Sequence, residues 1–319
     1  MTWVNTTGFE DALFRGKAKK GKPRPVIDAP EPPLEAPLAD AHTHLCGGDA
    51  PLVLARAAVH GEDFLCEVAQ AADDMEDVFA GLDTWCADAE EVLARIAPDI
   101  ARTRGIPHVR VAVGCHPHNA RDFTPELEAR IRELTHDPRV CAIGEIGLDY
   151  FYDNSERDDQ RRVFRVQIRL AQEAGLPVQL HVRDAHAEAF QILREEGFPQ
   201  AGVLLHCCSL PPEELRPWIE AGCYISYGGA LTFARSDEAR EAAKLVPEDR
   251  MVFETDAPYM TPVPLRGTKC ESAHVVFTAA KLAEVRGCPP GEPRRRFLQQ
   301  VHDNALALLD REPTAWQLS

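Results

Sequence analysis

Two short apolar runs in this sequence end in side chains that can bind a metal or move a proton. Ala142–Tyr150 (AIGEIGLDY) carries Glu145 and Asp149, and Pro177–Asp184 (PVQLHVRD) carries His181. Strands buried on both faces read as near-continuous apolar runs, and parallel strands carry their chemistry at their carboxyl ends. Each residue alone is equally compatible with a satisfied buried charge or a core histidine. Together the runs predict neighbouring strands that direct a carboxylate and an imidazole into one site.

Residues of the same kind follow other apolar stretches. His42 and His44 form a His-x-His motif, and alternation along a strand places both imidazoles on one side, within reach of one ion. The candidate ligands are four imidazoles and two carboxylates, a set without thiolate that suits zinc, manganese or a similar divalent ion: His42, His44, Glu145, His181, His206 and Asp256. If Glu145 bridges, two ions would lie about 3.5–4 Å apart.

Eight strand patterns alternate with helix patterns over most of the chain. The predicted strands are Leu38–His44, Asp63–Ala71, His108–Val113, Val140–Ile146, Val178–Val182, Gly202–His206, Cys223–Tyr227 and Arg250–Glu254. Between and after them we predict helices at Pro51–His60, about Asp74 to Arg102, Thr124–Thr135, Asp158–Ala174, Ala185–Glu196, Pro212–Ala221, Ser236–Leu245, Ser272–Arg286 and Pro293–Asp310.

This alternation of strand and helix predicts a parallel sheet, and eight such units can close into a barrel. The alternative, a doubly wound open sheet, gathers its ligands near one switch point. A barrel instead brings the carboxyl end of every strand to one mouth. Because the ligand-type residues follow six of the eight strands, we predict a TIM-type (β/α)8 barrel over residues 38–319, with C-terminal helices.

Residues 1–37 differ from the rest in composition. A basic run, RGKAKKGKPRP at Arg15–Pro25, precedes the proline-rich segment APEPPLEAP. Proline and charge at this density favour an extended, mobile segment. We therefore predict a solvated extension, with an arm for nucleic acid as the alternative.

Charge and cysteine usage restrict the partners and the compartment. The formal net charge of −16 argues against a surface that grips nucleic acid or an anionic membrane nonspecifically. A polyanionic substrate stays open, because bound divalent cations can reverse the local field of an acidic pocket. The ten cysteines include no CxxC pair, and the sequence shows no signal peptide and no membrane-spanning run. These features predict a cytoplasmic protein that does not interact with membranes.

At these motifs the sequence resembles the TatD-type metal-dependent hydrolases, the deoxyribonuclease-like branch of the amidohydrolase superfamily. The resemblance extends from about Leu38 to Asn304. It rests on DAHTHL (Asp40–Leu45), VGCHPH (Val113–His118), AIGEIGLDY (Ala142–Tyr150), GLPVQLHVRDA (Gly175–Ala185), LLHCCS (Leu204–Ser209), YISYGGALTF (Tyr224–Phe233) and ETDAPYMTPVPLRG (Glu254–Gly267).

The resemblance implies a TIM-type barrel with two divalent ions (zinc, manganese or magnesium) and a phosphodiester substrate, such as DNA ends or nucleotides. By motif position the ligands form two sets with a bridging carboxylate: His42, His44 and Asp256 for one metal, His181 and His206 for the other, and Glu145 between them.

The expected mechanism is attack on phosphorus by a hydroxide held between the two cations. Asp256 is the candidate general base, although it could also serve only as a ligand. His116 and His118 are predicted to contact the substrate phosphate or support the ligands, with an alternative metal shell as the other interpretation. Arg183 and Arg266 are candidate phosphate clamps, because a guanidinium fork matches phosphate oxygens.

Departures from the family pattern lie around the mouth rather than among the ligands. Cys208 and Leu210 stand where the family usually has an aromatic residue and a glycine, and Cys270–His274 replaces the usual sequence after Arg266-Gly267. These departures leave the identity of the substrate undetermined. The alternative function is a metal-dependent amidohydrolase or esterase acting on an amide, lactone or ester. A non-enzymatic barrel that binds a partner through its N-terminal segment is a third hypothesis.

Overall fold

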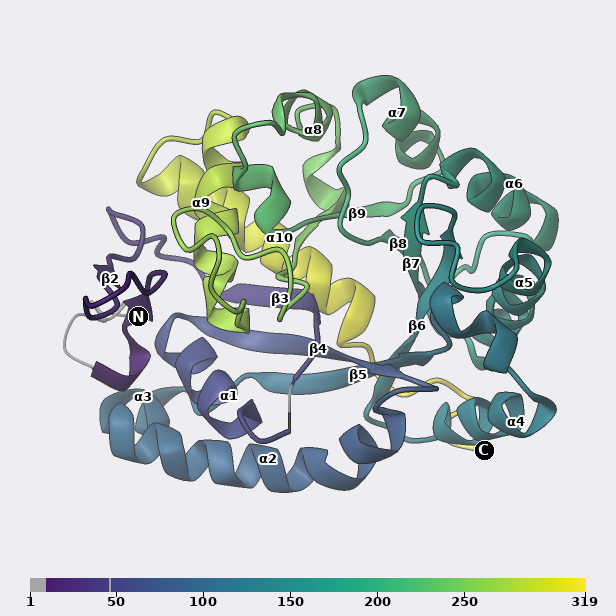
Figure 1. Ribbon diagram of the computed structural model, residues 1–319, viewed down its shortest axis with the longest axis horizontal. Helices are drawn as coiled ribbons and strands as arrows, with labels where there is room; N and C mark the ends of the chain where they lie inside the picture. The colour runs from purple at the N-terminus through teal and green to yellow at the C-terminus, as the bar shows by residue number, and fades with distance from the viewer. Residues whose placement is uncertain (1–9, 46) are drawn as a thin grey trace.

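The computed structural model describes residues 10–45 and 47–319. Its main sheet has eight parallel strands, and strands consecutive in the chain are neighbours in space (Figure 1). They are β3 (Leu38–Thr43), β4 (Glu62–Gln70), β5 (His108–Gly114), β6 (Val140–Asp149), β7 (Val178–Arg183), β8 (Val203–Leu205), β9 (Tyr224–Tyr227) and β10 (Met251–Phe253). All eight predicted strands are confirmed.

Helices follow nearly every strand and surround the sheet (Figure 1). They are α1 (Ala50–Val59), α2 (Met75–Ile96), α3 (Pro98–Thr103), α4 (Pro125–Leu134), α5 (Arg157–Ala174), α6 (His186–Glu196), α7 (Pro212–Glu220), α8 (Asp237–Ala243), α9 (Val275–Val285) and α10 (Glu292–Leu309). The Thr124 side chain caps α4 by accepting from the Leu127 N–H, and Gly175 ends α5 in the left-handed conformation (φ 67°). The predicted TIM-type barrel is confirmed.

The two outer strands of the sheet, β3 and β10, meet at the end that carries the site. Just past these strands, the Asp256 N–H donates to His42 O (2.9 Å) and the His44 N–H donates to Ala257 O (2.8 Å). The buried carboxylate of Asp40 also accepts from the Thr255 N–H (2.9 Å). These bonds fix Asp256 beside the two histidines of β3 and its following loop.

A close approach of backbones sets the spacing of β6 and β7. Gly147 pairs with His181 in the ladder, and a Cβ at Gly147 would lie only 1.9 Å from His181 O. Its φ of +148° is also one that other residues rarely adopt. Glycine at this position therefore lets the strand that carries Glu145 lie directly against the strand that carries His181.

The buried face of α5 holds the loops that support the site. Phe164 and Ile168 on this face belong to the same apolar cluster as Ile146 of β6. Two buried glutamines share the face: Gln160 Oε1 accepts from the Asp149 N–H (2.8 Å), and Gln167 Oε1 accepts from the Cys115 N–H (2.7 Å). The helix thereby fixes the carboxyl ends of β5 and β6.

The N-terminal segment corrects one prediction. Residues 10–37 are not an irregular segment throughout: β1 (Phe14–Arg15) and β2 (Val26–Ile27) pair as an antiparallel hairpin, whereas residues 17–25 between them are exposed as predicted. Phe14 is buried and stacks on the His60 ring at a centroid distance of 4.0 Å. The Lys- and Pro-rich composition gave no sign that Phe14 would be buried. This one aromatic side chain places the short hairpin on the surface of the barrel. Residues 1–9 lie outside the described part of the chain, and the domain boundary at residue 37 stays a prediction.

Two features of the described residues bear on the compartment. No helix among them is long and apolar enough to span a bilayer. Their nine cysteines are all free thiols. The cytoplasmic location stays a prediction.

Candidate metal centre

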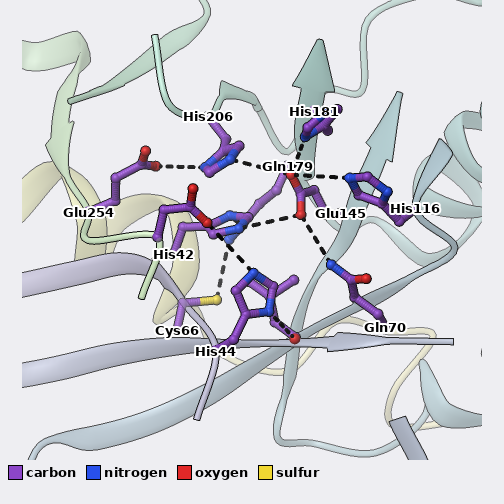
Figure 2. A network of polar contacts seen from close by, with 12 residues as sticks. His42, His44, Cys66, Gln70, His116, Glu145, Gln179, His181, His206 and Glu254 are labelled. Carbon is purple, nitrogen blue, oxygen red and sulfur yellow. Dashed lines mark hydrogen bonds and ion pairs between the residues drawn. The ribbon is translucent and has the colours of Figure 1, made fainter. Parts of the chain in front are cut away.

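Glu145 lies at the centre of the site, and three imidazoles lie closest to its carboxylate, with that of His116 farther out at 3.9 Å (Figure 2). Glu145 Oε1 is 2.8 Å from His181 Nδ1 and 3.3 Å from His206 Nε2. Glu145 Oε2 is 3.6 Å from His42 Nε2. The carboxylate comes from β6, and the imidazoles come from β7, the end of β8 and β3. The barrel therefore brings imidazoles from these three separate segments to one carboxylate.

Asp256 and His44 extend this group at the junction of β10 and β3. His44 Nε2 lies 3.8 Å from Asp256 Oδ1, and the His44 ring meets the His42 ring edge-on at 5.3 Å between centroids. The ligand atoms of His42, His44 and Asp256 lie within 4.8 Å of one another, and so do those of His42, Glu145 and His206. All six side chains predicted as ligands thus form one contiguous cluster.

Each of the four imidazoles contacts a protein acceptor through its outer ring nitrogen, and Figure 2 shows this contact between His206 and Glu254. The contacts are His42 Nδ1 to Gln179 Oε1 (2.8 Å), His44 Nδ1 to Val68 O (3.1 Å), His181 Nε2 to Asp149 Oδ2 (3.0 Å) and His206 Nδ1 to Glu254 Oε2 (3.0 Å). Because these oxygens only accept, the outer nitrogen carries the proton. Once a ring is neutral, its inner nitrogen offers a lone pair to the shared space, as metal-ligating histidines do. The inner nitrogen of His181 instead faces Glu145 Oε1 at 2.8 Å in the metal-free protein.

One nitrogen of the His42 ring indicates whether a cation fits this space. His42 Nε2 is fully enclosed and has no hydrogen-bond partner among the described residues. A buried polar atom left unpaired costs roughly 1–3 kcal/mol. A divalent cation would satisfy this nitrogen together with the neighbouring carboxylate oxygens. The donor set of nitrogen and oxygen suits zinc, manganese or another such ion, so the residues present fit a metal site.

Burial and charge act in opposite directions on the two carboxylates. Burial favours the neutral form of Glu145, but the surrounding imidazoles, led by His206, outweigh it and hold the pKa of Glu145 well below its usual range. Burial dominates at Asp256 and raises the pKa of that carboxyl well above its usual range. Burial also lowers the pKa of His181, but the nearby carboxylates outweigh it and raise that pKa to about 9. In the metal-free protein His181 therefore holds a proton that a bound cation would displace.

His116 and His118 lie at the edge of the cluster. The His118 N–H donates to His116 Nδ1 (3.2 Å), so the proton of a neutral His116 ring is on Nε2. That nitrogen is 3.9 Å from Glu145 Oε1, and burial lowers the pKa of the His116 ring to about 3. This tautomer makes His116 a neutral N–H donor beside the cluster. His118 Nε2 lies 2.8 Å from Asp149 Oδ2.

Two cavities meet above the cluster, with volumes of about 790 and 610 Å³. Residues that line both are His181, Arg183, His206, Asp256 and Met260. The Arg183 guanidinium lies 3.9 Å from the centroid of the Phe151 ring, so the predicted clamp is at the mouth. The Arg266 guanidinium instead lies 3.7 Å from the centroid of the Phe233 ring and is not among the described residues that line these two cavities.

The outer partners of the imidazoles are the residues that the sequence prediction missed. Gln179 precedes His181 by two positions, and Glu254 precedes Asp256 by two. Alternation along β7 (Val178–Arg183) places Gln179 and His181 on one face, so that signal was present, whereas Glu254 and Asp256 lie past the end of β10 (Met251–Phe253). Asp149 was noted as an ionisable residue of the run Ala142–Tyr150 but was not assigned to the site, and the strand predicted over Val140–Ile146 continues to Asp149 in the structure.

Replacing Glu254 with glutamine is expected to weaken metal binding by about 10- to 100-fold, because the carboxylate that orients His206 is lost. The measurement is a competition titration of Zn²⁺ against a chromophoric chelator. Glu248→Gln is the matched control, because it removes the same charge from a residue just before β10. The Glu248 side chain is 45% exposed and takes part in none of the imidazole contacts described above. Equal Zn²⁺ affinities in the two variants would contradict the orienting role of Glu254.

The barrel and its cluster of nitrogen and oxygen ligands are the features of a metal-dependent hydrolase. A family model described as TatD related DNase matches residues 39–310. This chain belongs to the TatD family of metal-dependent hydrolases.

Relatives and solved structures agree with this assignment. An uncharacterized metal-dependent hydrolase TatD from Mycobacterium tuberculosis is 35% identical over 266 residues, 80% of this chain and 92% of that protein. A protein from Citrobacter koseri named 3'-5' ssDNA/RNA exonuclease TatD is 36% identical over 182 residues, 56% of this chain and 70% of that protein. The crystal structure of YJJV, a TatD homologue from Escherichia coli, superposes with a TM-score of 0.71 at 25% identity, covering 86% of this chain and 98% of that one.

Proposed function

We propose that this TatD-family hydrolase is a phosphodiesterase of the deoxyribonuclease type, acting on DNA ends or nucleotides. The observation that carries the proposal is the cluster of six ligands below a mouth that also presents the His116 N–H and the Arg183 guanidinium. Both are donors suited to phosphate oxygens. The Citrobacter koseri relative, named as an exonuclease, supports the same substrate class.

The ligands would hold two divalent cations that share Glu145. The two oxygens of Glu145 face different imidazoles, which supports a bridging role: Oε1 faces His181 and His206, and Oε2 faces His42. Bound cations would supply Lewis acidity, which lowers the pKa of a water molecule and offsets charge on phosphoryl oxygens. The outer acceptors of the imidazoles fix the orientation of the rings before any ion arrives, so that each inner nitrogen faces this space.

Three side chains of the mouth would act on the substrate itself. Asp256 lines both cavities, and we assign it the role of accepting the proton of the attacking water. His116, as a neutral donor, would give a hydrogen bond to a non-bridging phosphoryl oxygen as negative charge develops there. Arg183, held over the Phe151 ring, would orient the phosphate.

A substrate panel tests this proposal. It contains a single-stranded oligonucleotide, bis(4-nitrophenyl) phosphate, a lactone, a carboxylic ester and an amide, each with Zn²⁺, Mn²⁺, Mg²⁺ or chelator. We expect hydrolysis of the diesters that stops with chelator and returns with one of the ions. Metal-loaded protein that cleaves the lactone, ester or amide and no diester would replace the proposal by the amidohydrolase or esterase alternative.

A further inference from the structure

The basic hairpin, residues 14–27 including β1 and β2, is held in one place on the barrel. Phe14 packs against His60 of the segment after α1 and edge-on against Phe277 of α9, with centroid distances of 4.0 and 4.9 Å. The Arg24 guanidinium closes the hairpin by donating to Arg15 O (2.8 Å) and Gly16 O (3.1 Å). Figure 1 shows the hairpin beside α9. The cations of this segment are therefore presented at a fixed site and not spread along a free tail.

The charge of the hairpin is opposite to that of the whole chain. Residues 15–25 hold six cations and no carboxylate, whereas the chain has a formal net charge of −16. The four lysines are exposed and form no ion pair with any described residue: Lys17, Lys19, Lys20 and Lys22. Such a dense cluster of unneutralised cations on an acidic protein marks a surface for a polyanion.

The hairpin borders the mouth through the loop that follows β10. A Cβ at Gly267 would lie 3.1 Å from Lys17 Cδ, so Lys17 lies directly against this loop. The same loop carries Asp256 of the metal centre and Tyr259, whose side chain is 64% exposed. The Tyr259 ring meets the His44 ring edge-on at 6.5 Å and lines the smaller cavity. One loop thus carries a ligand of the metal centre, an exposed aromatic ring and the glycine that Lys17 contacts.

The opposite side of the mouth does not favour an extended polyanion. Besides Asp256, the larger cavity, toward α6 and α7, is lined by three carboxylates: Asp184, Glu188 and Glu214. Besides Glu145 and Asp256, the smaller cavity is lined by one carboxylate, Asp73, and by the cation Arg121. Outside the ligand cluster, phosphates of a strand would therefore be repelled more on the α6 and α7 side than on the Tyr259 side. The mouth thus has two unlike halves, and its charge distribution selects one direction for a long substrate.

We propose that the basic hairpin is a docking arm for single-stranded nucleic acid, which binds the phosphates of the strand beyond the metal centre while Tyr259 stacks on a base. The proposal deepens the proposed function, because it assigns the same active site a long, single-stranded substrate and a direction of entry. Ionic contacts from the lysines supply affinity without sequence preference, and aromatic stacking tolerates every base.

The test removes the four lysine charges together in Lys17→Gln/Lys19→Gln/Lys20→Gln/Lys22→Gln. Binding is measured by fluorescence anisotropy with a cleavage-resistant phosphorothioate oligonucleotide of roughly 20 nucleotides over a series of salt concentrations. We expect the Kd at low salt to rise at least about tenfold, and the slope of log K against log salt to become shallower by about 2–3, since each lost phosphate contact on a single strand contributes about 0.7. The kcat/KM for bis(4-nitrophenyl) phosphate should not change.

A matched control removes four cations from the helical surface instead: Arg102→Gln/Lys244→Gln/Lys281→Gln/Arg295→Gln. Each of these residues forms an i,i+3 ion pair at its own helix. The net charge changes equally, so the control should bind the oligonucleotide like the unmodified chain. Equal Kd values in the hairpin variant and the unmodified chain would overturn the proposal. It would also be overturned if the unmodified full chain bound anionic phospholipid vesicles through these lysines and did not bind the oligonucleotide. Because the probe is not cleaved, this result is independent of whether the chain hydrolyses any diester.

Discussion

Replacing Asp256 with asparagine lowers kcat for phosphodiester hydrolysis by about 10³-fold, within the 10²–10⁴ range that a positioned general base contributes. Asparagine has the same shape but cannot accept a proton from water. The fold should survive, because burial already disfavours the charged form of Asp256 in the metal-free protein. Asparagine also tolerates the left-handed backbone at this position, where φ is 54°. The measurement is steady-state kinetics on bis(4-nitrophenyl) phosphate, with thermal unfolding of the metal-free variant as a check on folding.

Asp184→Asn is a close control for this experiment. Asp184 also has a left-handed backbone (φ 53°) and lines the mouth, but it has no place in the ligand cluster. Its substitution should leave kcat within about threefold of the unmodified chain, as expected for an interaction worth well under 1 kcal/mol. If Asp256→Asn keeps full kcat at saturating metal, Asp256 is not the proton acceptor.

Replacing Glu145 with glutamine is expected to reduce bound metal from two ions per chain to one or none, and kcat/KM by about 10⁴-fold or more. The reason is that Glu145 is the one carboxylate among the described residues that contacts imidazoles from three segments of the barrel, so its charge attracts cations to both halves of the cluster. A glutamine side chain offers a single neutral oxygen and cannot bridge two cations. Metal content is measured by inductively coupled plasma mass spectrometry after gel filtration.

Glu188→Gln removes the same charge from the same mouth and serves as the control. The Glu188 carboxylate accepts from the Tyr150 hydroxyl (2.8 Å) and contacts no imidazole of the cluster among the described residues. This variant should keep two ions. A Glu145→Gln variant that also keeps two ions would show that Glu145 does not bridge.

The fold and the ligand cluster could be predicted from the sequence because both depend on short-range patterns. Apolar runs bounded by turn signals identify buried strands, and His42, Glu145 and His206 stand at the ends of such runs. The barrel topology then brings the strand ends to one mouth without further information. This is why side chains more than two hundred residues apart, such as His42 and Asp256, could be assigned to one site.

The residues that were missed depend on exact strand ends and on contacts across the barrel. Strand β6 continues to Asp149, so alternation from Glu145 through Gly147 places Asp149 on the same side as Glu145. Predicting the strand to end at Ile146 removed that inference. The partner of Arg266 could not be predicted in this way either: it stacks on Phe233, a residue of another loop, and only the packing of the two loops reveals it.

Amino-acid composition could not predict where the N-terminal hairpin lies. Lysine and proline dominate residues 15–25, and both indicate an exposed, extended segment. The exposure of the lysines is as expected, whereas the fixed position depends on Phe14 and on the surface formed by His60 and Phe277. Composition describes the average of a segment, and here a single aromatic anchor decides where the segment lies.

The most direct measurement is a crystal structure of the full chain purified with Mn²⁺, with anomalous diffraction data collected above the manganese edge. The account predicts two anomalous peaks on either side of the Glu145 carboxylate, one contacted by His42, His44 and Asp256 and the other by His181 and His206. Anomalous peaks confined to other parts of the chain, with the six side chains contacting no ion at saturating Mn²⁺, would contradict it.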